Sequence, residues 1–173
     1  RAFSLPCIEE EGLEAADLIA SYARAAQREG WDVTIVSSDK DLMQLVGEEN
    51  GARIDMLDTM KSQRIYVEEV EEKFGVGPEL VGDVLALMGD TADNVPGIYG
   101  IGPKTASKLI SEHGSLTAAL DFAPEMKKSK LKERLLGGRG DAELSRVLVA
   151  LKEDCDLPQS LEEFELEIGR AHV

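Results

Sequence analysis

The apolar residues of the chain recur first with helical and then with strand-like spacing. Between Glu14 and Arg28 they are three or four residues apart, which predicts a helix that ends at Gly30. Residues 31–38 (WDVTIVSS) are rich in β-branched side chains and predict a buried parallel strand. A helix, a tight turn and a parallel strand form an α/β unit, in which ligands gather beyond the carboxyl end of the strand.

The rest of the chain changes from mixed elements to helices alone. A short helix is expected over 42–46, a strand pair over 52–57 and 63–67, and an acidic helix over 67–74. Later apolar patterns predict helices over 78–88, 103–113, 116–122, 126–136 and 141–151. We therefore expect a partial α/β core over residues 1–75 and a helical subdomain over residues 76–166.

A glycine-rich segment joins two of these helical patterns. Residues 96–102 (PGIYGIG) alternate glycine with bulky residues, and Pro103 stands at the first position of the next helix. Glycine lets a phosphate approach backbone N–H groups, and a helix N-terminus attracts the same anion. Taken alone, such a turn is more often an ordinary loop, but the flanking helices indicate a helix-hairpin-helix, also called helix-three-turn-helix. The expected DNA contacts are Gly97, Gly100, Ile101, Gly102, Lys104 and Thr105.

Acidic residues stand in pairs at three of the predicted element ends. An α/β sheet would bring these ends together, and six carboxylates without bases between them would repel one another unless cations held them. Each pair also has a simpler explanation, because acids favour helix N-caps and first turns. Together they predict a site for two divalent ions, Mg²⁺ or Mn²⁺, suited to phosphodiester hydrolysis. The expected ligands are Glu14, Asp17, Asp39, Asp41, Asp90 and Asp93, the last four being the catalytic group.

The formal net charge of −15 argues against nucleic-acid binding when it is taken alone, because phosphate contacts need clustered Lys and Arg. The distribution of charge changes this picture. Residues 127–139 (KKSKLKERLLGGR) hold six basic residues and one acid. Such a run is often only a solvated helix face, but here it follows the hairpin. We expect Lys127, Lys128 and Lys130 to contact DNA.

Other features of the composition limit the class of protein. Cys7 and Cys155 have no Cys or His partners at metal-binding spacing, so we expect two reduced thiols. No apolar run is long enough to cross a bilayer, which favours a cytoplasmic monomer without a membrane partner. The chain opens without Met and is interpreted as part of a longer protein. Residues 167–173 (EIGRAHV) follow no structural pattern and are interpreted as a non-native tail.

The segment from Gly89 to Leu109 resembles the core of the 5′ nuclease family, specifically the 5′-to-3′ exonuclease domain of bacterial DNA polymerase I. The family motifs Glu-Ala-Asp-Asp, Asp-Lys-Asp and Gly-Asp-x-x-Asp-Asn resemble residues 14–17, 39–41 and 89–94. The resemblance implies the C-terminal part of a PIN-like parallel-sheet nuclease core with its helical subdomain. It also implies cleavage of 5′ ends and flaps on nicked or branched DNA in replication and repair, a downstream polymerase domain, and K⁺ at the hairpin.

Two departures from the family pattern weaken the functional inference. Ala16 stands where the family carries a ligand aspartate, and the family's N-terminal half with further aspartates and a basic arch is missing. We therefore expect the 173-residue chain alone to be inactive. A non-catalytic module that binds branched DNA stays open as an alternative, as does a haloacid-dehalogenase-like phosphatase, which also places Asp-x-Asp at a strand tip.

Overall fold

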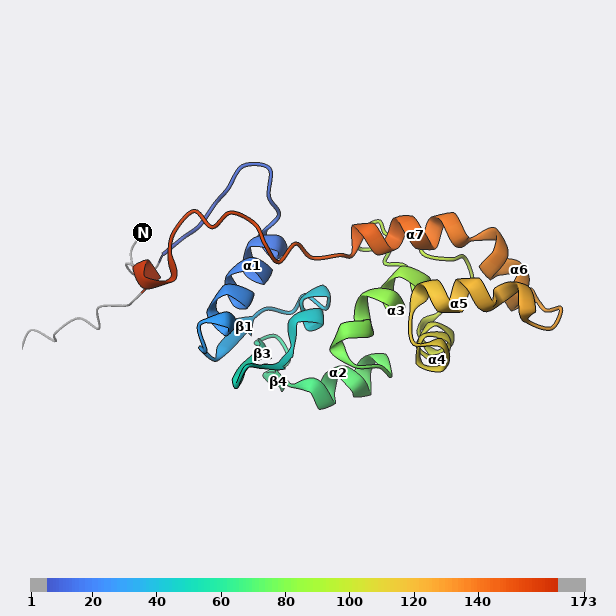
Figure 1. The fold of residues 1–173 in the computed structure, drawn as a ribbon, viewed down its shortest axis with the longest axis horizontal. Helices are drawn as coiled ribbons and strands as arrows, with labels where there is room; N and C mark the ends of the chain where they lie inside the picture. Colours follow the sequence, from blue (N-terminus) through green and yellow to red (C-terminus); the bar gives the residue numbers. More distant parts are fainter. Residues whose placement is uncertain (1–5, 165–173) are drawn as a thin grey trace, which may run out of the picture.

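The computed structural model describes residues 6–164, so the tail interpreted as non-native lies outside the described residues. Figure 1 shows a small sheet with its covering helix at one end of the molecule and a group of helices at the other. This order agrees with the predicted α/β core followed by helices. The elements are α1 (Ala15–Arg28), β1 (Val33–Val36), η1 (Asp41–Leu45), β2 (Gly47–Glu49), β3 (Ala52–Asp58), β4 (Gln63–Ile65), α2 (Val67–Phe74), η2 (Pro78–Leu80), α3 (Val81–Met88), α4 (Pro103–His113), α5 (Leu116–Phe122), η3 (Ala123–Glu125), α6 (Lys130–Gly137), α7 (Arg139–Leu148) and η4 (Leu161–Phe164).

The sheet is mixed and is built around β3. Strand β1 pairs with β3 in parallel, from Val33 opposite Ile54 to Val36 opposite Leu57. Strands β2 and β4 pair antiparallel with the two ends of the other edge of β3. The sequence predicted β1 and the β3–β4 pair but not β2. The turn between β2 and β3 was marked in the sequence by Asn50-Gly51. Both residues have positive φ (54° and 79°), as a two-residue hairpin turn requires.

The expectation of a long, buried first strand is wrong in two respects. Strand β1 spans four residues instead of the eight expected, and only Ile35 in it is buried. The side chain of Val36 is 63% exposed, because β1 lies at the edge of the described sheet. The run of β-branched residues therefore predicted a strand at the right place. It did not predict that most of the strand's side chains are exposed or only partly buried.

Helix α3 holds the two ends of the molecule together. Its residues Val81, Val84, Leu85 and Leu87 are almost completely buried and belong to one apolar core that extends from the sheet to α7. It packs against α4, α5 and α7 on the helical side and against η1 and η2 toward the sheet. The helical subdomain and the sheet therefore share one core, and α3 positions the loop that follows it.

Two helices of the subdomain begin at different residues from those predicted. Helix α6 begins at Lys130 instead of residue 126, because the Ser129 hydroxyl accepts a hydrogen bond from the Lys132 N–H and caps the helix (3.2 Å). Helix α7 spans Arg139–Leu148 instead of 141–151. No helix among the described residues is both long and apolar enough to cross a bilayer.

Residues 149–164, here called the C-terminal strap, run back from α7 along α1 (Figure 1). The hydroxyl of Ser21 donates to the Lys152 carbonyl (3.1 Å) and accepts from the Cys155 N–H (3.0 Å). The Tyr22 hydroxyl makes the same pair of hydrogen bonds with the backbone of Gln159. The strap thereby fixes the first helix of the chain to its last described segment.

Candidate metal centre and nucleic-acid interface

The loop after α3 crosses itself and places two aspartates on a tight turn. The backbone groups of Asp90 and Val95 exchange two hydrogen bonds (2.9 and 2.7 Å), and the Asp90 carboxylate accepts the Ala92 N–H (2.9 Å). Gly89 and Gly97 have positive φ (72° and 58°), and a Cβ on Gly97 would overlap the backbone of Gly89. The two glycines are therefore required for the close backbone crossing that presents Asp90 and Asp93.

Asp41 approaches the same place from the segment after β1. It is the first residue of η1, and its N–H donates to a carboxylate oxygen of Asp39 (2.9 Å). The Asp39 N–H in turn donates to the Ser37 hydroxyl (3.0 Å). These two bonds fix the turn beyond the carboxyl end of β1, which is where the sequence predicted the aspartates.

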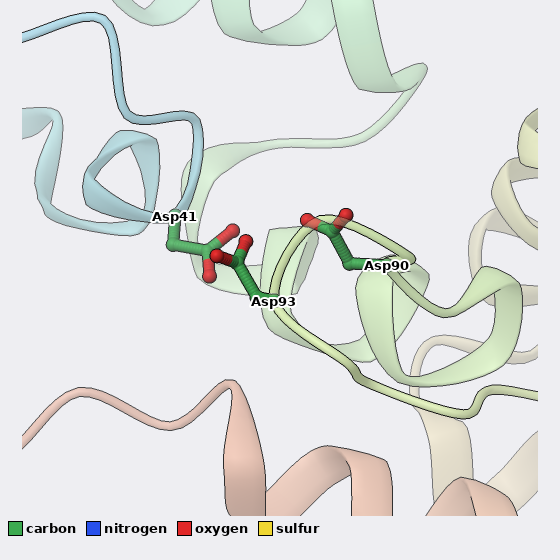
Figure 2. A group of neighbouring side chains, drawn as sticks. All are labelled: Asp41, Asp90 and Asp93. Atoms are coloured by element: carbon green, nitrogen blue, oxygen red, sulfur yellow. The ribbon is translucent and has the colours of Figure 1, made fainter.

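Asp41, Asp90 and Asp93 form a three-carboxylate group. Each offers one oxygen, and these oxygens lie within 4.8 Å of one another. Figure 2 shows the Asp41 carboxylate meeting that of Asp93 from the opposite segment, with Asp90 on the same loop as Asp93. One oxygen of Asp41, Oδ1, is buried and has no hydrogen-bond partner among residues 6–164. A buried carboxylate oxygen without a partner is costly, and hard anionic oxygens are the ligands that Mg²⁺ and Mn²⁺ prefer, so the group fits a divalent cation.

The electrostatics of the group are consistent with that fit. Burial, together with the negative charges of Asp39 and Asp93, raises the pKa of Asp41 above its ordinary value, and nearby Lys40 opposes the shift. The Lys40 ammonium pairs with Asp90 and lies 3.7 Å from an oxygen of Asp93. The expectation of carboxylates without an intervening base is therefore wrong. The signal was present in the sequence, because Lys40 stands between Asp39 and Asp41.

The other predicted ligands lie outside the three-carboxylate group. Asp39 is exposed and adjoins the group through its hydrogen bond to Asp41. Glu14 is exposed at the N-cap of α1, and Asp17 accepts the Lys152 N–H from the strap (3.0 Å). Ala16 is partly buried and packs against the core. Four of the six predicted ligands thus lie in or beside one site, and the pair on α1 does not join them.

Two buried isoleucines and two backbone hydrogen bonds anchor the glycine-rich hairpin of residues 97–102 to the protein core. Ile98 and Ile101 are each 3% exposed, and the Ile98 N–H donates to the Leu87 carbonyl (2.8 Å). The Gly97 N–H donates to the buried Ser145 hydroxyl on α7 (2.9 Å), so Gly97 supports the hairpin with a bond inside the protein. Tyr99 at the tip is 91% exposed. The buried isoleucines leave the outer surface of the hairpin to backbone groups and to Tyr99.

Some polar residues near the hairpin are exposed, and others donate hydrogen bonds to backbone carbonyls of the protein. Helix α4 begins directly after Gly102, where Lys104 is exposed and Thr105 is half-buried. Lys127, Lys128 and Lys130 are exposed, as expected. Lys132 donates instead to the backbone carbonyls of Pro124 and Met126 (2.6 and 3.0 Å). Arg134, which the sequence did not single out, donates to the Gly100 carbonyl (2.9 Å).

Comparisons with known proteins agree with this arrangement. The family model for the 5′-3′ exonuclease N-terminal resolvase-like domain matches residues 1–75, and that for the 5′-3′ exonuclease C-terminal SAM fold matches residues 76–171. DNA polymerase I of Rhizobium leguminosarum is 52% identical over 167 residues, which are 96% of this chain and 16% of that protein. A 5′-3′ exonuclease of Aquifex aeolicus is 39% identical over 166 residues, which are 94% of this chain and 53% of that protein.

A solved structure of T5 5′-exonuclease with bound zinc ions has a similar fold. Its TM-score is 0.78 at 24% identity, over 86% of this chain and 54% of that one. The expected nuclease core with a helical subdomain is thereby confirmed, and so is the resemblance from which it came. The chain spans about a sixth of the length of its polymerase I relative and about half of the A. aeolicus exonuclease.

Proposed function

Because the chain belongs to the 5′-3′ exonuclease family, we propose that its carboxylates take part in hydrolysing phosphodiester bonds at 5′ ends and flaps of DNA. The proposed cofactors are two divalent cations, Mg²⁺ or Mn²⁺. The similarity to DNA polymerase I over 96% of the chain supports a role beside a polymerase, in replication and repair. The proposed substrate is nicked or branched duplex DNA that carries a 5′ end.

The observation that carries this proposal is the three-carboxylate group, in which Asp41 Oδ1 has no hydrogen-bond partner among residues 6–164. Asp41 comes from the segment after β1, whereas Asp90 and Asp93 come from the loop after α3, 49 residues or more further along. Their convergence places three negative charges where burial already disfavours the ionised form of Asp41. A fold without a cation ligand at this place would be more stable with a neutral side chain there.

The chain's own residues would hold the cation and the substrate in place. Asp41, Asp90 and Asp93 would be the ligands, and Asp39 would be a second-ion ligand beside them. When bound, a pair of divalent ions generates a nucleophilic hydroxide from water and stabilises the departing oxygen. Asp39 holds the backbone of Asp41, and the turn closed by Asp90 and Val95 holds Asp93. Lys40 restrains the Asp90 carboxylate through its ion pair.

The hairpin that follows α3 would bind the duplex backbone. Backbone N–H groups near Gly100 and Gly102, and the N-terminus of α4 with Lys104 and Thr105, would receive phosphate oxygens. The exposed Lys127, Lys128 and Lys130 would add sequence-independent attraction to phosphates. Such contacts carry no base information, which suits an enzyme that acts on DNA structure.

Metal binding is the first test. Mn²⁺ binding to the 173-residue chain is followed by loss of the free-ion electron paramagnetic resonance signal. We expect binding that Mg²⁺ displaces and that Asp41→Asn weakens at least tenfold, about 1.4 kcal/mol. Asp154→Asn, in the exposed part of the strap, is the matched control and should bind as the unmodified chain does. Equal affinities for the two variants would refute the proposed site.

Cleavage is the second test. In a chimaera, this chain replaces the matching residues of the A. aeolicus exonuclease. We expect Mg²⁺-dependent cleavage of a 5′-flap substrate, which Asp41→Asn abolishes while duplex binding remains. A folded chimaera that binds the flap but leaves it intact, beside an active parent, would favour the non-catalytic binding module. The dehalogenase-like alternative is not proposed, because the loop after Asp93 leads into the hairpin and α4 and not back to the sheet.

A further inference from the structure

Arg134 reaches across from α6 to the tip of the glycine-rich hairpin. Its Nη1 donates to the Gly100 carbonyl at 2.9 Å, although 34 residues separate the two in sequence. The C-terminal end of the same helix also approaches the hairpin, since a Cβ on Gly138 would lie 2.7 Å from the side chain of Ile98. The guanidinium is therefore a defined part of the hairpin surface.

The absence of a side chain at Gly100 leaves room for this guanidinium. The residue has a φ of 79°, and a Cβ built on it would lie 2.5 Å from Arg134 Cζ. Any side chain at position 100 would occupy the place of the guanidinium. Glycine is favoured here by its positive φ, and a larger residue would push the guanidinium away from the Gly100 carbonyl.

The charge of Arg134 lacks a carboxylate partner in the part of the chain that the structure describes. Within residues 6–164 no acidic side chain pairs with it, whereas Arg24, Arg139 and Arg146 each have such a partner. One donor is used on Gly100, and a guanidinium has five. Arg134 is exposed, and the carbonyl that it binds lies two residues before Gly102, the N-cap of α4. Backbone N–H groups and Lys104 at that helix start also favour an anion.

We infer that Arg134 is a phosphate-binding residue of the hairpin and that its guanidinium supplies the positive charge which the family resemblance assigns to K⁺. The inference rests on the proposed DNA-binding function and names the residue that carries its hairpin contact. Carbonyl oxygens would have to ligate a K⁺ ion, but the Gly100 carbonyl already accepts a charged donor. A second cation next to the guanidinium would be repelled. Arginine also suits a phosphate better than a point charge does, because its donors match two phosphate oxygens.

The alternative is that Arg134 only holds the hairpin in shape. Salt dependence separates the two roles, because a phosphate contact contributes about 0.9 to the slope of log affinity against log salt concentration and a purely structural bond contributes nothing. Duplex affinity is measured by fluorescence anisotropy with the 173-residue chain, in EDTA, over a series of NaCl concentrations. Arg134→Gln is compared with Arg134→Lys and with Arg28→Gln, which removes an exposed arginine from the far end of α1.

We expect Arg134→Gln to bind about tenfold more weakly, with a slope smaller by about 0.9. Arg134→Lys should keep the slope, and Arg28→Gln should match the unmodified chain. Replacing NaCl by KCl at equal concentration should leave the affinity of the unmodified chain unchanged. An unaltered slope in Arg134→Gln, or binding by the unmodified chain that depends on K⁺, would overturn the inference alone. Failure of the unmodified chain to bind duplex would overturn the proposed function with it.

Discussion

Replacing Asp41 by asparagine should stabilise the fold in the absence of metal. The carboxylate has one buried oxygen without a hydrogen-bond partner among the described residues, and its ionised form is disfavoured by burial and by Asp39 and Asp93. Asparagine keeps the shape and removes the charge. Asparagine still places a polar atom there, so the gain comes from the removed charge alone, and for a half-buried group beside other carboxylates this is about 1 kcal/mol. About 1 kcal/mol corresponds to a rise in melting temperature of about 2 to 4 °C for a domain of this size.

The pH dependence follows from the direction of the shift. The folded-state pKa of Asp41 lies above its ordinary value of 3.8, so the ionised form destabilises the fold at neutral pH. This destabilisation is fully present above the folded pKa and is relieved as the pH falls through it. The gain in stability from Asp41→Asn should therefore be largest at pH 7. It should vanish below the pKa that Asp41 has in the unfolded chain.

Divalent metal should reverse the order of the melting temperatures of the unmodified chain and Asp41→Asn. A ligand at 100 times its dissociation constant adds about 2.7 kcal/mol to the stability of a protein that binds it only when folded. The unmodified chain should gain this increment in Mg²⁺, and Asp41→Asn should gain much less. Thermal unfolding followed by circular dichroism, with and without Mg²⁺, gives all four values, and Asp154→Asn serves as the charge-matched control. A variant that melts lower than the unmodified chain without metal would refute the reasoning, as would equal responses to Mg²⁺.

Four further predictions concern single residues. Gly97→Ala should lower stability by about 3 kcal/mol, because a Cβ would overlap the backbone of Gly89 at positive φ, whereas Gly102→Ala has open space and should change it by less than about 1 kcal/mol in the same chemical denaturation experiment. Gly100→Val should weaken binding to duplexes of different sequence about equally, since phosphate contacts carry no base information; a changed sequence preference in a competition assay would contradict this. Ala16→Asp should raise flap cleavage by the chimaera, mostly at low Mg²⁺, and superimposable Mg²⁺ titrations would show that position 16 is not a ligand. Tyr22→Phe removes both hydrogen bonds to Gln159 and should cost about 1 to 2 kcal/mol, measured as a lower urea midpoint, while an unchanged midpoint would mean that water replaces the hydroxyl.

Much of the site could be predicted because its information is local. The turn that presents Asp90 and Asp93 and the hairpin that follows are specified by glycines and short-range hydrogen bonds within 89–102. Asp39 and Asp41 follow a strand whose β-branched residues identified it. The strand over 47–49 was missed although Asn50-Gly51 marked its turn, because three residues are too few to show alternation.

The remaining features depend on contacts that sequence spacing does not encode. Asp17 looked like a metal ligand at a helix start, but its carboxylate accepts a backbone N–H 135 residues away. Arg134 looked like one more residue of a basic run, and only the packing of α6 brings it to Gly100. Lys40 reaches Asp90 across 50 residues. In each case a polar side chain binds a residue that is distant in sequence. The spacing of residues along the chain cannot distinguish such a side chain from one that is simply exposed to solvent.

The strap has a consequence for the order in which this chain matures during synthesis. Ser21 finds its partner at Lys152, 131 residues later, and Tyr22 finds Gln159 after 137. At about 10 residues per second, a ribosome needs about 13 s to deliver the first of these partners after Ser21 itself has been made. In the folded chain, Leu161 and Phe164 line part of an apolar groove of about 760 Å³ beside α1 and β1, and during that interval these two side chains are missing from it. Until residues 149–164 have been made, the apolar face of α1 can therefore associate wrongly, and the strap then covers part of it.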